Sequence, residues 1–191
     1  MGSKRVEINL IKNKIMNNLS KQRCYLAGAI DRVADRGNSW RDDITPFLVG
    51  LGIVVLNPLK KPTYFGDEDH ETAIYKKQLK KAKKYDELAS IMKIIRSVDL
   101  RMVDISDFLI VNLDLDVHPC GTLEEIFWAN RQKKPILIHM LQGKNNAPDW
   151  LFGTIPHQFI FDSWHDIGNY LLQVDSMSIS EHLDRWVFLK L

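Results

Sequence analysis

The chain has 191 residues, of which 45% are hydrophobic and 26% are charged. This balance excludes a disordered or fibrous chain and fits one compact domain. Lysine and arginine number 26 against 24 aspartates and glutamates, and the formal net charge of +2 is too small to indicate a nucleic-acid polymer as partner.

The two cysteines, Cys24 and Cys120, are too few for a disulfide framework and are accompanied by no second cluster of metal ligands. We therefore expect a protein of the reducing cytoplasm, with no metal and no cofactor. No apolar run approaches the roughly 20 residues that span a bilayer, and residues 1–18 lack the apolar centre of a signal peptide. No membrane association is expected.

Strand and helix patterns alternate along the chain. The apolar run 23–29, broken by Gly28, predicts a buried first strand that ends in a tight loop. Residues 40–51 have helical spacing, so we predict a helix there, with Pro46 tolerated only in its first turn. The β-branched run 53–56 predicts a second strand, which ends at Asn57 and Pro58.

A long charged segment follows the second strand. Its helical pattern runs from about Thr72 to Arg96, and we assign about residues 67–98 to a charged helical insertion. Two interpretations remain open, an inserted helix or helix pair that acts as a lid, and a solvated outer helix. The basic run 76–84 is interpreted as a surface face rather than a phosphate-binding patch.

Three more strands are predicted at 108–113, 135–139 and 159–161, with helices at 123–131 and 164–172. This alternation predicts an α/β fold with a doubly wound, five-stranded parallel sheet and helices on both faces. We expect a single domain with its core at about 22–175 and an extension at about 176–191. The amphipathic end of that extension packs either on its own domain or on a neighbouring subunit.

Ligands of such sheets bind beyond the carboxyl ends of the strands. Gly28, Ala29, Ile30 and Asp31 follow the first strand, Asn57 the second, and residues 114–122 the third. We expect these three loops to converge on one crevice.

A helix that begins near Gly121 and Thr122 carries Glu124 and Glu125. Its first amides and the threonine hydroxyl can hold an anion or a sugar hydroxyl, although Thr122 and Glu125 also match a capping box. Only one of the two glutamates can face the crevice, and we favour Glu125. Asp99, placed at the end of the long helical segment, is either a complementary acid or a helix-terminal hydrogen-bonding residue.

Four segments together resemble nucleoside 2-deoxyribosyltransferases and the related 2′-deoxynucleoside 5′-monophosphate N-hydrolases. The segments are YLAGAI at 25–30, NP at 57–58, DLRMVDISDFLIVNLD at 99–114 and GTLEEIFWA at 121–129. The likeness covers roughly residues 22–140 and lies in the order and spacing of the four pieces. It implies a flavodoxin-like, Rossmann-like domain.

The resemblance also implies roles for particular residues. Glu125 matches the glutamate that attacks C1′ of the deoxyribose, and Asp99 matches the aspartate that protonates or orients the departing base. Tyr25 matches the tyrosine that positions the nucleophilic carboxylate. The expected substrate-binding residues are Gly28, Ile30, Asp31, Gly121 and Thr122, together with Asn57 and Asp114 at two strand ends.

The chain departs from the family pattern in several places. Pro119 stands where many transferases have a further aspartate, with Asp116 and His118 as nearby substitutes. The family also takes an asparagine from a neighbouring subunit, which implies a homo-oligomer; the candidates here are Asn145, Asn146 and Asp149. Arg41 is either a 5′-phosphate contact or an exposed salt-bridge residue at a helix start.

Three functions remain open from the sequence. The first is a transferase that moves deoxyribose between nucleobases through a covalent deoxyribosyl-glutamate intermediate. The second is an N-glycosidase that hydrolyses a nucleoside 5′-monophosphate. Both are enzymes that use Glu125 on a small nucleoside or nucleotide. The third is a non-catalytic nucleotide-binding module on the same fold.

Overall fold

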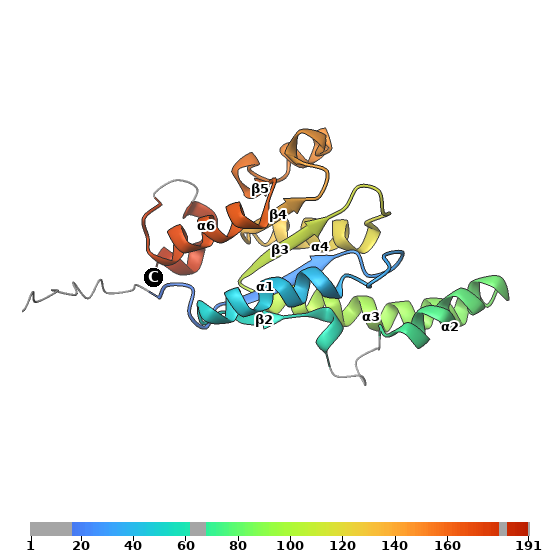
Figure 1. Cartoon of the computed structure of the whole chain (residues 1–191). Coiled ribbons are helices and arrows are strands. Elements are labelled where there is room, and N and C mark those ends of the chain that lie inside the picture. Colours follow the sequence, from blue (N-terminus) through green and yellow to red (C-terminus); the bar gives the residue numbers. More distant parts are fainter. Residues whose placement is uncertain (1–16, 62–67, 180–182, 191) are drawn as a thin grey trace, which may run out of the picture.

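The computed structural model describes residues 17–61, 68–179 and 183–190 (Figure 1). Its centre is a parallel sheet of five strands in the order β2-β1-β3-β4-β5. The strands are β1 Arg23–Gly28, β2 Val54–Leu56, β3 Phe108–Leu113, β4 Ile136–Met140 and β5 Ile160–Phe161. This is the flavodoxin-like order. Strand β2 lies on one side of β1 and the later strands are added on the other, so the switch point of the sheet lies between β1 and β3. The predicted fold class is confirmed.

Helices cover both faces of the sheet (Figure 1). One face carries α1 Asn38–Gly50 and α6 Trp164–Asp175, which meet where the rings of Trp40 and Trp164 stack with centroids 5.4 Å apart. The other face carries α3 Tyr85–Ile105 and α4 Cys120–Arg131, joined by a bond from the Trp128 indole to Asp104. The two shorter helices are α2 His70–Lys81 and α5 Asp149–Phe152.

The three central strands are buried almost throughout their length. Parallel strands covered on both faces need apolar side chains on both sides, which explains their continuous rather than alternating hydrophobic runs. Short 3₁₀ turns complete the chain, namely η1 Pro58–Lys60, η3 Lys144–Asn146, η4 His157–Phe159, η5 Leu183–Arg185 and η6 Val187–Lys190.

The prediction for Pro46 was wrong. Because α1 begins at Asn38, Pro46 lies well inside the helix and not in its first turn. An internal proline removes one backbone hydrogen bond, here the bond to the carbonyl of Asp42. Both residues are exposed, so water can reach the released carbonyl, and the helix continues.

The charged segment forms a helix pair, α2 and α3, separated by a break at Lys83 with φ 57°. Figure 1 shows α2 and the first part of α3 extending together beyond the sheet. The surface interpretation of the basic run holds for Lys77 and Lys81, which are exposed. Lys80 is exposed too, but it also lines the cavity described below. It is wrong for Lys76, which is buried and contacts Asp31 at 3.1 Å.

The described end of the chain packs on its own domain. Trp186 is fully buried, its indole N–H donates to the Tyr170 hydroxyl at 2.8 Å, and its ring lies 5.2 Å from that of Phe108. None of the helices within the described ranges is long and apolar enough to cross a membrane.

Candidate active site

A cavity of about 400 Å³ opens at the carboxyl ends of β1 and β3. Its wall comes from residues 28–32 after β1, from the inner side of α3, and from residues 118–122 with Glu124 and Glu125 at the start of α4. Two other hollows, of about 430 and 630 Å³, are lined by neither Glu125 nor Asp99. Only the first cavity therefore combines the strand ends with carboxyl groups.

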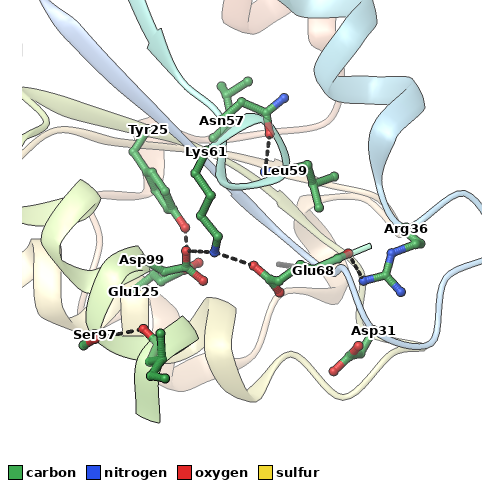
Figure 2. Close-up of polar contacts among 12 residues, drawn as sticks. Tyr25, Asp31, Arg36, Asn57, Leu59, Lys61, Glu68, Ser97, Asp99 and Glu125 are labelled. Atoms are coloured by element: carbon green, nitrogen blue, oxygen red, sulfur yellow. Dashed lines mark hydrogen bonds and ion pairs between the residues drawn. The ribbon is translucent and has the colours of Figure 1, made fainter. Parts of the chain in front are cut away.

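Tyr25 and Glu125 form the central contact of this cavity (Figure 2). Tyr25 is fully buried in β1, and its hydroxyl donates to Oε1 of Glu125 at 2.7 Å. Burial raises the pKa of Tyr25 well above its ordinary value, so the hydroxyl keeps its proton and remains a donor. Glu124 also lines the cavity, but its carboxylate is turned to solvent, where Arg96 binds it at 2.8 Å. Of the two neighbouring glutamates, only Glu125 points at the sheet.

The capping-box alternative for Thr122 was wrong. The N-cap of α4 is Pro119, with no side-chain capping bond, so Thr122 already lies inside the helix. Its side chain is buried and lines the cavity. Glu125 is held by Tyr25 of the neighbouring strand instead of by the helix end.

Asp99 lines the cavity from α3. It lies more than one turn before the helix ends at Ile105, so the expectation of a helix-terminal position was wrong. Its Oδ1 accepts a bond from Nζ of Lys61 at 2.6 Å, and the same ammonium donates to Oε1 of Glu68 at 2.8 Å (Figure 2). Neither Lys61 nor Glu68 could be identified from the sequence as a site residue, because no local pattern links them to Asp99.

Two of the carboxyls that line the cavity have raised pKa values. Burial raises the pKa of Glu125 to about 8, against the opposing hydrogen bond from Tyr25. Burial and the nearby Glu68 carboxylate raise the pKa of Asp99 to about 6, against the ammonium of Lys61. Between these two pKa values the pair therefore holds about one proton, mainly on Glu125.

The structure separates the expected substrate-binding residues into two groups. Gly28, Ile30, Asp31, Gly121 and Thr122 line the cavity. Asn57 and Asp114 do not.

Asn57 and Asp114, which lie outside the cavity, each accept a hydrogen bond from a backbone amide. The side-chain oxygen of Asn57 accepts a bond from the Leu59 amide at 2.9 Å and starts η1. Oδ1 of Asp114 accepts bonds from the Asp116 amide at 3.0 Å and from the Gln142 side chain at 2.6 Å. Asp114 therefore ties the loop after β3 to the end of β4.

Both interpretations of Arg41 were wrong. The side chain is fully buried and neither meets the cavity nor forms an exposed salt bridge. Its guanidinium donates to the carbonyls of Leu26 at 3.2 Å, Gly28 at 3.0 Å and Gly37 at 2.8 Å. Arg41 thus joins the end of β1 to the start of α1 and shapes the loop that lines the cavity.

His118 and Pro119 line the cavity, whereas Asp116 accepts a bond from Gln142 at 3.1 Å. The candidates for a neighbouring-subunit contact do not line the cavity of their own chain; they are Asn145, Asn146 and Asp149. Across the three described ranges, no three histidine, cysteine, aspartate or glutamate residues gather in a way that fits a metal ion.

No family model matches the chain, and a comparison with curated proteins finds no match. Among solved structures, it is similar to a 2-deoxyribosyltransferase from Leishmania mexicana, with a TM-score of 0.48 and 17% identity over 80% of this chain and 97% of that one. It is also similar to a CMP N-glycosidase from Clostridium botulinum, with a TM-score of 0.45 and 18% identity over 78% of this chain and 97% of that one. At such low identity and TM-score, the evidence for any reaction has to come from the cavity itself.

Proposed function

We propose that this protein cleaves the N-glycosidic bond of a 2′-deoxynucleoside or its 5′-monophosphate, with Glu125 as the nucleophile. The observation that carries the proposal is the 2.7 Å bond from Tyr25 to Glu125, in a cavity that Asp99 also lines. The tyrosine hydroxyl fixes one carboxylate oxygen and leaves the other for attack. A volume of about 400 Å³ lies within the usual range for small-molecule sites.

The reacting form of this carboxyl pair has Glu125 ionised and its proton on Asp99. In the first half-reaction, a Glu125 oxygen forms a bond to C1′ as the bond from C1′ to the base nitrogen breaks. The base leaves with the bonding electron pair and takes the proton of Asp99. The products are a deoxyribosyl ester of Glu125, the free base and an ionised Asp99. Dividing one displacement into two steps in this way is the general advantage of a carboxylate nucleophile.

The second half-reaction releases Glu125. A nucleobase nitrogen or a water oxygen attacks C1′, the ester bond breaks, and the proton of the attacking group passes to Asp99. Capture by a second base makes the protein a 2-deoxyribosyltransferase, which is our first candidate. Capture by water makes it an N-glycosidase, the second candidate, and here the basic side chains at the cavity wall are suited to a 5′-phosphate; they are Arg32, Lys80 and Arg96.

Liquid chromatography of incubated substrates tests this proposal. Deoxynucleosides and their 5′-monophosphates are each incubated with and without a second free base, using wild type, Glu125→Gln and Glu87→Gln. Glu87 is a matched control, because it is a surface glutamate of α3 that pairs with Lys84 outside the cavity.

We expect turnover in wild type and Glu87→Gln and a loss of at least a hundredfold in Glu125→Gln. A new nucleoside that needs the added base identifies transfer, and base release from monophosphates without exchange identifies hydrolysis. No turnover of any substrate contradicts the proposal and favours the third function, a non-catalytic nucleotide-binding module. Full activity in Glu125→Gln contradicts the role of Glu125 as the nucleophile.

A further inference from the structure

Lys61 reaches Asp99 at the cavity wall because of the turn that precedes it. The Asn57 side chain caps η1, Pro58 is the first residue of that turn, and Lys61 follows directly at its end. Figure 2 shows the Lys61 side chain running from this turn toward Asp99 and the Tyr25 hydroxyl. Asn57, which was expected to bind substrate, therefore caps the turn that directs Lys61 toward Asp99.

The Lys61 ammonium is shared between two carboxyl groups. It lies 2.6 Å from Oδ1 of Asp99 and 2.8 Å from Oε1 of Glu68, and the exposed fractions of the Lys61, Asp99 and Glu68 side chains are only 4%, 12% and 8%. The preceding Lys60 differs in every respect, since 59% of its side chain is exposed and its partner is the surface residue Asp42.

The charges around Asp99 come from several elements. Lys61 and Glu68 face it from the segment between β2 and α2, Glu125 from α4, and the Tyr25 hydroxyl from β1. Arg41 of α1 influences Glu125 and Glu68 from farther away, and the cavity wall adds three basic side chains, Arg32, Lys80 and Arg96. Two carboxyls thus bind one buried ammonium, and Glu125 lies near both of these carboxyls.

Stability alone does not account for such a cluster. Removing an ammonium and two carboxylates from water costs several kcal/mol per ion, and a buried ion pair is often no more stable than apolar side chains of the same size. An effect of Lys61 on the proton transfer of Asp99 would explain why the cluster is buried at the cavity wall.

We propose that Lys61 and Glu68 are positioning residues for Asp99. Lys61 orients the Asp99 carboxyl toward the departing base and stabilises the carboxylate that remains after proton transfer. Glu68 holds the Lys61 ammonium in place. This inference rests on the proposed function. Lys61 keeps its own proton throughout, and Asp99 regains its proton from the attacking base or water in the second half-reaction.

Glu68 also balances the effect of Lys61 on Asp99. A lysine alone lowers the pKa of a neighbouring carboxyl, and an acid of very low pKa is ionised at neutral pH before it can donate. Burial and Glu68 counter this effect and bring the pKa of Asp99 to about 6. The cluster thus keeps the pKa of Asp99 above its ordinary value while a cation stays beside its conjugate base.

Two substitutions shift this balance in opposite directions. Lys61→Met removes the cation, so the pKa of Asp99 rises and the pH profile of kcat moves to higher pH by about one unit. Glu68→Gln removes an anion and moves the profile to lower pH by a similar amount.

We expect kcat of Lys61→Met to fall by about tenfold or more at neutral pH, with a smaller change in KM, because general acid catalysis is typically worth about 10²- to 10⁴-fold. Lys60→Met is the matched control and keeps the wild-type profile.

Carbon-13 NMR titration of aspartate carboxyls, assigned with Asp99→Asn, provides a readout independent of turnover. Opposite shifts of Asp99 in the two variants, matched by the kinetic profiles, support the proposal. If the variants lose activity while their pH profiles of kcat stay unshifted, Lys61 and Glu68 have a purely structural role and the proposal is overturned. If Lys61→Met does not fold, the direction of the shift in Glu68→Gln decides. If wild type turns nothing over, the proposed function fails, and with it the catalytic part of this inference, while the titration still decides whether Lys61 and Glu68 control Asp99.

Discussion

Glu124 and Glu125 are adjacent in sequence, yet they lie in different surroundings. Successive residues of a helix point about 100° apart, so one carboxylate meets Arg96 at the outside and the other meets Tyr25 at the sheet. The pKa of Glu125 is raised to about 8, mainly by burial. A buried carboxyl of this kind affects the stability of the fold as well as its chemistry.

Glu125 makes the free energy of unfolding depend on pH. Its carboxyl has a pKa of 4.5 as a free group and about 8 in the fold, so between these values the unfolded chain loses a proton that the folded chain keeps. Stability therefore falls as pH rises through this window. Glu125→Gln removes this loss, and we expect the variant to match wild type below pH 4.5 and to be more stable above pH 8.

The gain amounts to a few kcal/mol, because each unit of pKa shift corresponds to about 1.4 kcal/mol. Denaturant unfolding at a series of pH values measures it, with Glu87→Gln as the surface control. If Glu125→Gln has the same pH slope as wild type, the carboxyl is hydrated in solution and our account of its burial is wrong.

The loop between β1 and α1 shows how an element is held in the shape that the cavity needs. Gly37 precedes α1 with φ 72°, a left-handed conformation, and its carbonyl accepts a bond from Arg41. A Cβ atom at Gly37 would lie 2.5 Å from the carbonyl oxygen of Ala29 and would also collide with the Arg41 guanidinium. Only glycine fits between these groups.

Gly37→Ala should lower the free energy of unfolding by about 1–3 kcal/mol, since the new methyl group meets backbone and a buried side chain. It should also raise KM, because residues 28–32 of this loop line the cavity. Thermal unfolding and steady-state kinetics check both effects. Gly50→Ala is the control, because a Cβ there meets nothing within 4 Å. Equal stability of the two variants would contradict the packing described for the loop.

On the scale of the whole molecule, the last described turns close the α6 face of the sheet. Trp186 packs against Phe108 of β3, and its indole donates to Tyr170 of α6. Residues far apart in the chain thus share one hydrophobic cluster with the central strands. The end of the chain contributes to the core that supports the cavity.

Trp186→Ala removes a fully buried indole, so we expect a loss of about 3–5 kcal/mol in the free energy of unfolding. Val187→Ala, in which 59% of the native side chain is exposed, should cost less than about 0.5 kcal/mol. Calorimetry at several protein concentrations measures both. A melting temperature of Trp186→Ala equal to that of wild type would show that the chain end does not pack on its own domain in solution.

Much of the fold and part of the site could be predicted from local pattern. Buried parallel strands appear as continuous apolar runs, so β1, β3 and β4 were placed to within a residue at each end. Parallel sheets bind ligands at the carboxyl ends of their strands. From this rule Gly28 and Glu125 could be predicted to lie in one cavity, and both line it. These conclusions needed only periodicity and chain order.

The sequence by itself therefore determined the sheet and the position of the cavity, and it favoured Glu125 over Glu124 as the candidate nucleophile. Only the tertiary structure decided that Lys61 meets Asp99, that Arg41 is buried among backbone carbonyls, and that Asn57 caps a turn outside the cavity. The physical reason is that hydrophobic periodicity encodes which face of an element is buried. It does not encode which polar side chains from distant segments meet, because that depends on how turns and helices pack against one another.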